Sequence, residues 1–145
     1  MPTDLYITRG DLPDIGDPIA ELQSQLRKYP QVRVEGSPSR VLVRALDAKG
    51  FEVGFEVDKD RCTVFCDGWH EEFSNRDEAT ACFSMALSQE CRLKVWRRAG
   101  IAYRWELQKR DADEWKRVST RSRLLFPLWA RLEIVYLQNS LLEAA

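Results

Sequence analysis

Apolar residues recur along this chain with two different spacings, and the first spacing predicts two helices. In the first helix they recur every three or four residues, at Ile19, Leu22, Leu26 and Tyr29. Asp17 suits the cap, Pro18 suits the first position, and Pro30 ends the helix, which is expected over 18–29. A second stripe, Ala79, Cys82, Phe83, Ala86 and Leu87, predicts a helix over 75–89 that Ser74 or Asn75 can cap.

The second spacing is strict alternation, which is typical of strands with one buried face. It begins at Val41 and Val43, is clearest over 51–57, and continues through Cys62 to Cys66. Turn-forming residues separate these segments at 47–50, 58–60 and Asp67-Gly68. Alternation returns over 91–125, with further turns at Ala99-Gly100 and 111–113. The segment 128–142 fits either a strand or a helix, and its β-formers Ile134, Val135 and Tyr136 favour the strand.

These elements predict an α+β fold in the order α-β-β-β-α-β-β-β-β. We expect an antiparallel sheet of about six to eight strands with both helices on its apolar face. The expected core is Leu22, Leu26, Val41, Val43, Phe51, Val53, Phe55, Val57, Cys82, Phe83, Leu93, Val95, Tyr103, Trp105 and Leu107. The acidic, turn-rich residues 1–16 are expected to be a loosely ordered arm, followed by a single domain over 17–145.

Composition narrows the class of protein. The chain has 145 residues, of which 44% are hydrophobic and 31% charged, as in ordinary globular domains. No apolar run approaches the roughly 18 residues that cross a bilayer, and the acidic N-terminus does not resemble a leader, so we expect a cytoplasmic protein without a membrane partner. The four cysteines are expected to be free thiols, because a domain of this size needs no disulfide in a reducing compartment.

Charge is divided unevenly between the two halves of the chain. Residues 1–90 carry 10 Lys and Arg against 17 Asp and Glu, whereas residues 91–131 carry 12 against 4. Because the second stretch is predicted to be strands, many of these cations should share one sheet face. The residues proposed for this basic face are Arg92, Lys94, Trp96, Arg104, Arg117, Arg121 and Arg123.

Three interpretations of the basic face remain open. Glu52, Glu56 or Glu106 can neutralise it, as cross-strand pairs often do. An acidic protein partner, including a second copy of this chain, can bind it. Single-stranded nucleic acid is the third candidate ligand, because its bases can stack on a ring such as Trp96 that is surrounded by cations. The acidic pI of about 5.9 argues against this ligand. We favour a non-enzymatic module that acts through protein contacts as a homodimer, because open sheets leave edges that pair readily.

One polar cluster is a weaker candidate for catalysis. Cys66, Asp67, His70 and Glu72 combine a thiol, carboxylates and the sole histidine, which are the residue types of general-base and thiol chemistry. In an extended segment, however, His70 and Glu71 point to opposite faces, so convergence is not expected. A turn followed by a solvated edge segment is the simpler interpretation. No sequence motif for zinc, nucleotide or serine hydrolysis is present, and no metal or cofactor is expected.

In element order, size and acidity the chain is similar to the small chaperones of bacterial type III secretion. That family places an α-β-β-β-α-β-β domain in a homodimer, so the resemblance implies a protein-binding homodimer. It rests on architecture and transfers no individual residue, and the extra C-terminal strand departs from it.

Overall fold

The computed structural model describes residues 18–123 and 129–139, which form two helices and two antiparallel sheets. The five-stranded sheet has the order β1-β2-β3-β4-β5 and contains β1 (Val34–Ser37), β2 (Arg40–Val43), β3 (Val53–Asp58), β4 (Arg61–Cys66) and β5 (Trp69–Phe73). The four-stranded sheet has the order β8-β7-β6-β9 and contains β6 (Cys91–Arg98), β7 (Ile101–Asp111), β8 (Glu114–Ser122) and β9 (Leu132–Leu137). The predicted α+β class is therefore confirmed, with the strands divided between two sheets. The expected arm over 1–16 lies outside the described residues.

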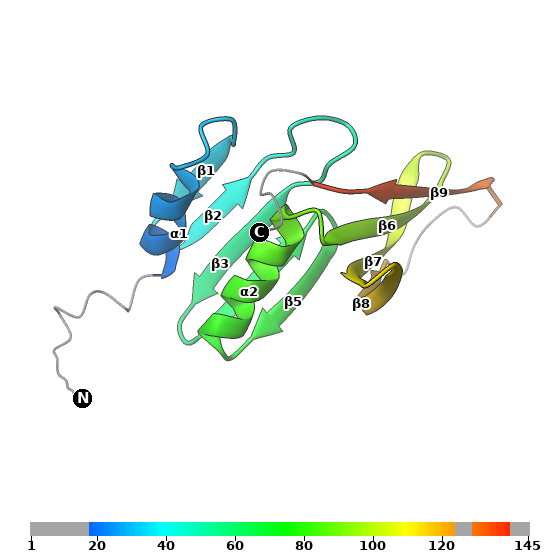
Figure 1. Ribbon diagram of the computed structural model, residues 1–145. Coiled ribbons are helices and arrows are strands. Elements are labelled where there is room, and N and C mark those ends of the chain that lie inside the picture. The colour runs from blue at the N-terminus through cyan, green and yellow to red at the C-terminus, as the bar shows by residue number, and fades with distance from the viewer. Residues whose placement is uncertain (1–17, 124–128, 140–145) are drawn as a thin grey trace, which may run out of the picture.

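Both helices cover the same face of the five-stranded sheet (Figure 1). Helix α1 (Pro18–Leu26) ends three residues earlier than Tyr29, which the prediction included. Pro30 has no amide hydrogen and disfavours helical backbone at the residue before it, so the chain leaves the helix as a turn. Helix α2 (Arg76–Leu87) begins after Asn75, whose side chain accepts a 3.0 Å hydrogen bond from the Glu78 amide, as a cap should. The proposed cap of α1, Asp17, lies outside the described residues.

Several predicted turns are tight hairpins. Asp67-Gly68 joins β4 to β5, and Ala99-Gly100 joins β6 to β7. A positive φ, between 54° and 60°, is adopted by Asp67 and Ala99 at these turns, by Lys59 in the β3–β4 turn and by Ala112 in the β7–β8 turn. The chain therefore reverses with the left-handed backbone that two-residue hairpins require.

One strand was not expected. Strand β1 pairs with β2 through the Ser37-to-Arg40 turn, yet all four of its residues are exposed. Without a buried face it has no alternating pattern from which to be predicted. The ambiguous segment 128–142, in contrast, contains β9, which confirms the strand interpretation.

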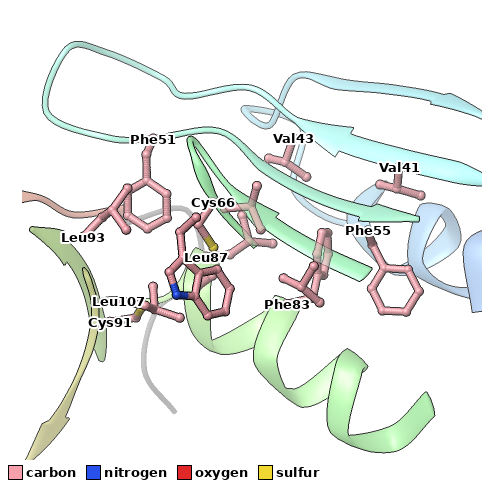
Figure 2. Close-up of a cluster of buried hydrophobic side chains, with 14 of the residues drawn as sticks. Val41, Val43, Phe51, Phe55, Cys66, Phe83, Leu87, Cys91, Leu93 and Leu107 are labelled. Carbon is pink, nitrogen blue, oxygen red and sulfur yellow. The ribbon is translucent and has the colours of Figure 1, made fainter. Parts of the chain in front are cut away.

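Buried side chains from both sheets form one hydrophobic cluster. Figure 2 shows Leu93 and Leu107 of the four-stranded sheet in the same cluster as Val43 and Phe55 of the five-stranded sheet. Phe55 meets Phe83 of α2 edge to face, with ring centroids 5.7 Å apart. The predicted core is buried throughout, except that Val57 and Cys82 are partly buried at its margin. Phe51 and Phe55 are 3% and 0% exposed, so the predicted register of this sheet is confirmed.

Two tryptophans join the sheets. Trp69 of β5, which is fully buried, donates a 2.9 Å hydrogen bond from Nε1 to Ser119 Oγ of β8. Trp105 of β7 donates another of 2.9 Å to Asp67 Oδ2 in the β4–β5 hairpin. A buried indole N–H needs a partner, and here both partners lie on the opposite sheet. The four-stranded sheet is thus held beside β5, with its other face turned away from the core.

Candidate functional site

The candidate site is the face of the four-stranded sheet that points away from the hydrophobic core, called here the outer face. On β6, Cys91, Leu93 and Val95 are buried, so the alternate residues Arg92, Lys94 and Trp96 project outward. Across the ladder, Arg92 lies opposite Gln108, Lys94 opposite Glu106, and Trp96 opposite Arg104 of β7. On the other side of β6, Lys94 lies opposite Tyr136 of β9.

Cations and aromatic rings alternate across the outer face. The Arg92 guanidinium carbon is 4.5 Å from the ring centroid of Trp115 on β8 and 4.3 Å from that of Tyr136 on β9. Arg92 of β6 therefore lies between an aromatic ring of β8 and an aromatic ring of β9. Arg110 contacts the Trp115 ring as well, at 4.9 Å.

Trp96 has two cationic neighbours. The Lys94 Nζ atom is 4.7 Å and the Arg104 guanidinium carbon 4.6 Å from the centroid of its ring. Contacts of this kind contribute about 0.5–1 kcal/mol each when exposed, and so favour these positions of the long side chains. A ring orders a cation without cancelling its charge, whereas a carboxylate would cancel it. The ring contacts thus favour one position of each cation without pairing it with a carboxylate.

Carboxylates compensate this charge only in part. Glu106 lies on the outer face and accepts hydrogen bonds from Gln108 Nε2 at 2.5 Å and Thr120 Oγ1 at 3.5 Å. Gln108 in turn accepts a 2.6 Å bond from Arg92 Nε. None of the ion pairs within 18–123 and 129–139 involves Arg92, Lys94 or Arg104. The other two carboxylates considered for neutralisation belong to the five-stranded sheet, where Glu52 pairs with Arg44 and Glu56 lies opposite Arg40.

Apolar groups continue the outer face on β9. Leu132, Ile134 and Tyr136 alternate along the strand and are 41%, 42% and 48% exposed. Ile134 lies directly opposite Trp96 in the β6–β9 ladder. The outer face therefore places an apolar strip beside a set of cations.

The remaining basic-face candidates do not all lie on this side. Arg121 lies opposite the buried Trp105, on the inner side of the sheet, and donates to the Thr120 carbonyl. Arg117 lies opposite Gln108 and also lines a separate cavity of about 370 Å³ beside Cys82. Arg123 is exposed just beyond the end of β8. The structure thus brings Arg92, Lys94, Trp96 and Arg104 together and leaves Arg121 outside the group.

Sequence reasoning missed three residues that contact Arg92 on the outer face, namely Trp115, Tyr136 and Gln108. Trp115 and Tyr136 stood in segments predicted to be strands. Their proximity to Arg92 depends on which strands flank β6, and β9 is 34 residues or more from β6 in the sequence. Alternation gives the face of a residue within its own strand, but not the neighbouring strand.

The four residues of the polar cluster are directed to different partners. Cys66 is fully buried, and this burial raises the pKa of its thiol well above the ordinary value. Asp67 accepts from Trp105, and Glu72 is ion-paired with Arg61 at 3.2 Å. His70 is exposed beside the Phe65 ring, with the ring centroids 6.4 Å apart. They form no common constellation for acid–base or thiol chemistry.

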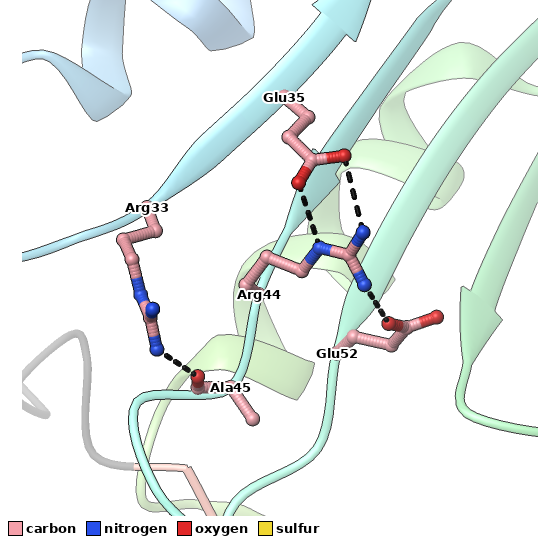
Figure 3. Close-up of polar contacts among 5 residues, drawn as sticks. All are labelled: Arg33, Glu35, Arg44, Ala45 and Glu52. Carbon is pink, nitrogen blue, oxygen red and sulfur yellow. Dashed lines mark hydrogen bonds and ion pairs between the residues drawn. The ribbon is translucent and has the colours of Figure 1, made fainter.

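A polar cleft lies next to β1 and β2, and Figure 3 shows the polar contacts among some of the residues that line it. It encloses about 520 Å³ and is lined in part by Arg33, Glu35, Arg44 and Glu52. Arg44 donates to both oxygens of Glu35, at 2.8 and 3.3 Å, and to Glu52 at 3.1 Å. The hydrogen bonds from Arg44 hold the pKa of the Glu35 carboxyl below its usual value. Because two carboxylates of the chain already compensate the charge of Arg44, this side chain serves to tie β1 to the segments next to β2 and β3.

Comparison with protein-family models, with curated proteins and with solved structures finds no match for this chain. Within the described ranges, no group of three or more His, Cys, Asp or Glu side chains is placed to hold a metal ion. The helices described here are too short or too polar to cross a membrane. The function is therefore argued from the outer face alone.

Proposed function

We propose that this chain is a cytoplasmic, non-enzymatic binding module that recognises a protein partner through the outer face. The observation that carries the proposal is the alternation of cations and rings around Arg92 and Trp96, with Glu106 as the carboxylate in their midst. Tryptophan, tyrosine and arginine are the residues most enriched at the energetic centres of protein interfaces. Their arrangement on a rigid sheet also lowers the ordering cost of binding.

The chemistry of this surface defines the partner. Arg92, Lys94 and Arg104 require carboxylates opposite them, and Leu132 and Ile134 require an aliphatic or aromatic group. A partner segment that combines acidic and apolar side chains satisfies both. The expected homodimer stays a prediction that is independent of this recognition chemistry, because a single copy carries the whole outer face.

Single-stranded nucleic acid fits this face less well than protein does. Base stacking needs a ring with a free side, and the rings of Trp96, Trp115 and Tyr136 each have a cation of the chain within 5 Å. We therefore treat nucleic acid as an outcome to be tested rather than as a second proposal.

A peptide-display selection tests the proposal without knowledge of the natural partner. A random peptide library is selected on the wild-type protein, and the enriched peptides are measured against Arg92→Glu/Lys94→Glu by fluorescence anisotropy. We expect enrichment of Asp and Glu next to aromatic or aliphatic residues, and affinity at least tenfold weaker in the variant. The matched control is Arg27→Glu/Lys28→Glu, which makes the same charge change on two exposed residues at the end of α1.

Equal binding of the peptides by both double variants would reject the outer face as the recognition surface. A labelled single-stranded DNA oligonucleotide provides the other arm of the experiment. Binding that weakens steeply with salt and is lost in Trp96→Ala would replace the protein partner with nucleic acid. Circular dichroism of each variant verifies that the fold is retained.

A further inference from the structure

The two sheets have four edge strands, and three of them are protected against pairing. Edge strands in natural proteins are commonly shortened, charged or covered. Strand β1 has only four residues, and it carries Glu35, which is ion-paired to Arg44 just after β2. Strand β5 lies against the other sheet through Trp69 and Ser119. Strand β8 carries several charges, including Lys116 and Arg121.

Strand β9 has none of these protections. Its sequence, Leu132 to Leu137, contains a single charged residue, Glu133, and is otherwise β-branched, aromatic or aliphatic. It pairs with β6 along one edge, and within the described ranges no strand pairs with its other edge. Every second residue of the strand points to the outer side, and these residues, Leu132, Ile134 and Tyr136, are exposed and apolar. This edge therefore offers unpaired backbone donors and acceptors beside an apolar strip.

We propose that a second copy of this chain pairs with β9 in antiparallel orientation, around a two-fold axis at Ile134. The strand is complementary to itself in this register. On the outer side, Ile134 lies opposite Ile134 of the second copy and Leu132 opposite its Tyr136, so apolar groups meet apolar groups. On the inner side, Glu133 lies opposite Val135, so the two carboxylates do not face each other. The two four-stranded sheets become one continuous sheet, with a closed two-fold interface.

This pairing has a consequence for recognition, and in that respect the inference rests on the proposed function. The contact between the two β9 strands is called here the seam. The outer faces of the two copies become one surface, with Tyr136 and Arg92 of each copy near the seam. A partner with two acidic segments could then bind both halves, and its second contact would be intramolecular. The seam itself follows from the edge geometry of β9.

Light scattering after size-exclusion chromatography tests the seam. We expect the wild-type chain to be a dimer at tens of micromolar, and Ile134→Lys to be a monomer, because two ammonium groups would meet at the axis. Val118→Lys is the matched control. Val118 and Ile134 are 41% and 42% exposed and lie on the two opposite edge strands of one sheet, so only the Ile134 change should dissociate the dimer. A monomeric wild type, or a dimer that survives Ile134→Lys, overturns the proposal.

Cross-linking gives a second readout that does not depend on a destabilising charge. Directly opposite residues in an antiparallel pair have Cβ atoms about 4.5–5.5 Å apart, close to disulfide range. Ile134→Cys should form a covalent dimer under mild oxidation, whereas Val118→Cys should not. Both variants are made in a Cys82→Ser background, because Cys82 is only partly buried and lines the same cavity as Val118, whereas Cys62, Cys66 and Cys91 are buried. Failure of Ile134→Cys to cross-link rejects this register even if a dimer exists.

Different results would reject recognition through the outer face and pairing of the two β9 strands. Arg92→Glu/Lys94→Glu changes β6 and leaves the β9 edge intact, so it should abolish peptide binding and preserve the dimer. Ile134→Lys should abolish the dimer, and peptide binding is judged on Arg92→Glu/Lys94→Glu alone, because Ile134 also lies in the apolar strip of the outer face. A dimer that selects no acidic peptide would reject the proposed function and retain the seam.

Discussion

The indole nitrogen of Trp105 donates a 2.9 Å hydrogen bond to Asp67 Oδ2, and this bond links the four-stranded sheet to a hairpin of the five-stranded sheet. The partners are 38 residues apart in the chain. Trp105 is 7% exposed, and its ring also covers the neighbouring Gly68. The contact therefore helps to determine where the outer face stands relative to the helical layer.

Removal of this hydrogen bond should lower stability without changing the fold. Trp105→Phe keeps an aromatic ring and loses the N–H donor, so the free energy of unfolding should fall by about 1–3 kcal/mol, including lost ring area. Asp67→Asn keeps both an acceptor and tolerance of the positive φ at this position, and should cost less than Asp67→Ala. Urea unfolding monitored by circular dichroism measures all three. Equal losses for Asp67→Asn and Asp67→Ala would show that the acceptor contributes nothing.

Gly68 should tolerate no larger side chain. A Cβ atom added there would clash with Cε2 and Cζ2 of Trp105, far inside van der Waals contact. Gly68→Ala should therefore destabilise the protein by about 1–3 kcal/mol, as overpacking does. The double variant Gly68→Ala/Trp105→Leu removes the obstructing ring, so its loss should be smaller than the sum of the single losses. Additive losses in this cycle would contradict a clash with Trp105.

Alternation was sufficient to predict the inward face of the first sheet, because Val41, Val43, Val53 and Phe55 all lie on regular strands. It was not sufficient for β8. A bulge between Leu107 and Gln108 shifts the β7–β8 register by one residue. Consequently Arg121 lies on the inner side while Arg117 lies opposite Gln108, although both have the same parity in the sequence. Bulges of this kind have no reliable signature in a single sequence.

The sequence also did not reveal which distant strands pair with each other. The outer face depends on β9 lying next to β6, which brings Tyr136 beside Arg92 and Lys94. The charge split indicated that cations gather on the second half of the chain, and the structure shows four of the predicted residues together. The order β8-β7-β6-β9 depends on long-range packing, including the buried Asn139 after β9.

Asn139 should be among the most sensitive polar positions. It is 3% exposed, accepts a 3.0 Å bond from the Phe51 amide and donates a 3.1 Å bond to the Ala86 carbonyl. Asn139→Ala leaves both backbone groups buried without these partners, at a cost of about 2–4 kcal/mol for the pair. The neighbouring Gln138→Ala removes an exposed contact and should cost roughly 0.5 kcal/mol or less. Similar losses for the two variants in urea unfolding would show that the Asn139 bonds are not important.

Acid should weaken the Glu35–Arg44 contact. Arg44 lowers the pKa of Glu35 in the folded chain below the usual 4.5, so the unfolded chain takes up the proton first as the pH falls. Stability from this pair is therefore fully present above about pH 4.5 and is lost as the pH falls through the folded pKa. The difference in urea midpoint between wild type and Glu35→Gln should be constant at neutral pH and shrink below pH 4.5. A difference that persists unchanged at pH 3 would contradict this contribution.

The buried thiols should be unreactive until the chain unfolds. Burial raises the pKa of Cys82 and of Cys91 to about 12, and that of Cys66 well above its ordinary value. The reactive species is the thiolate, so at pH 8 these side chains should be labelled by a disulfide reagent far more slowly than an exposed thiol. In denaturant, all four cysteines should react at the rate of free cysteine. Mass spectrometry of partly labelled protein assigns each site, and rapid native labelling of Cys66 or Cys91 would show that the sheets separate on the labelling timescale.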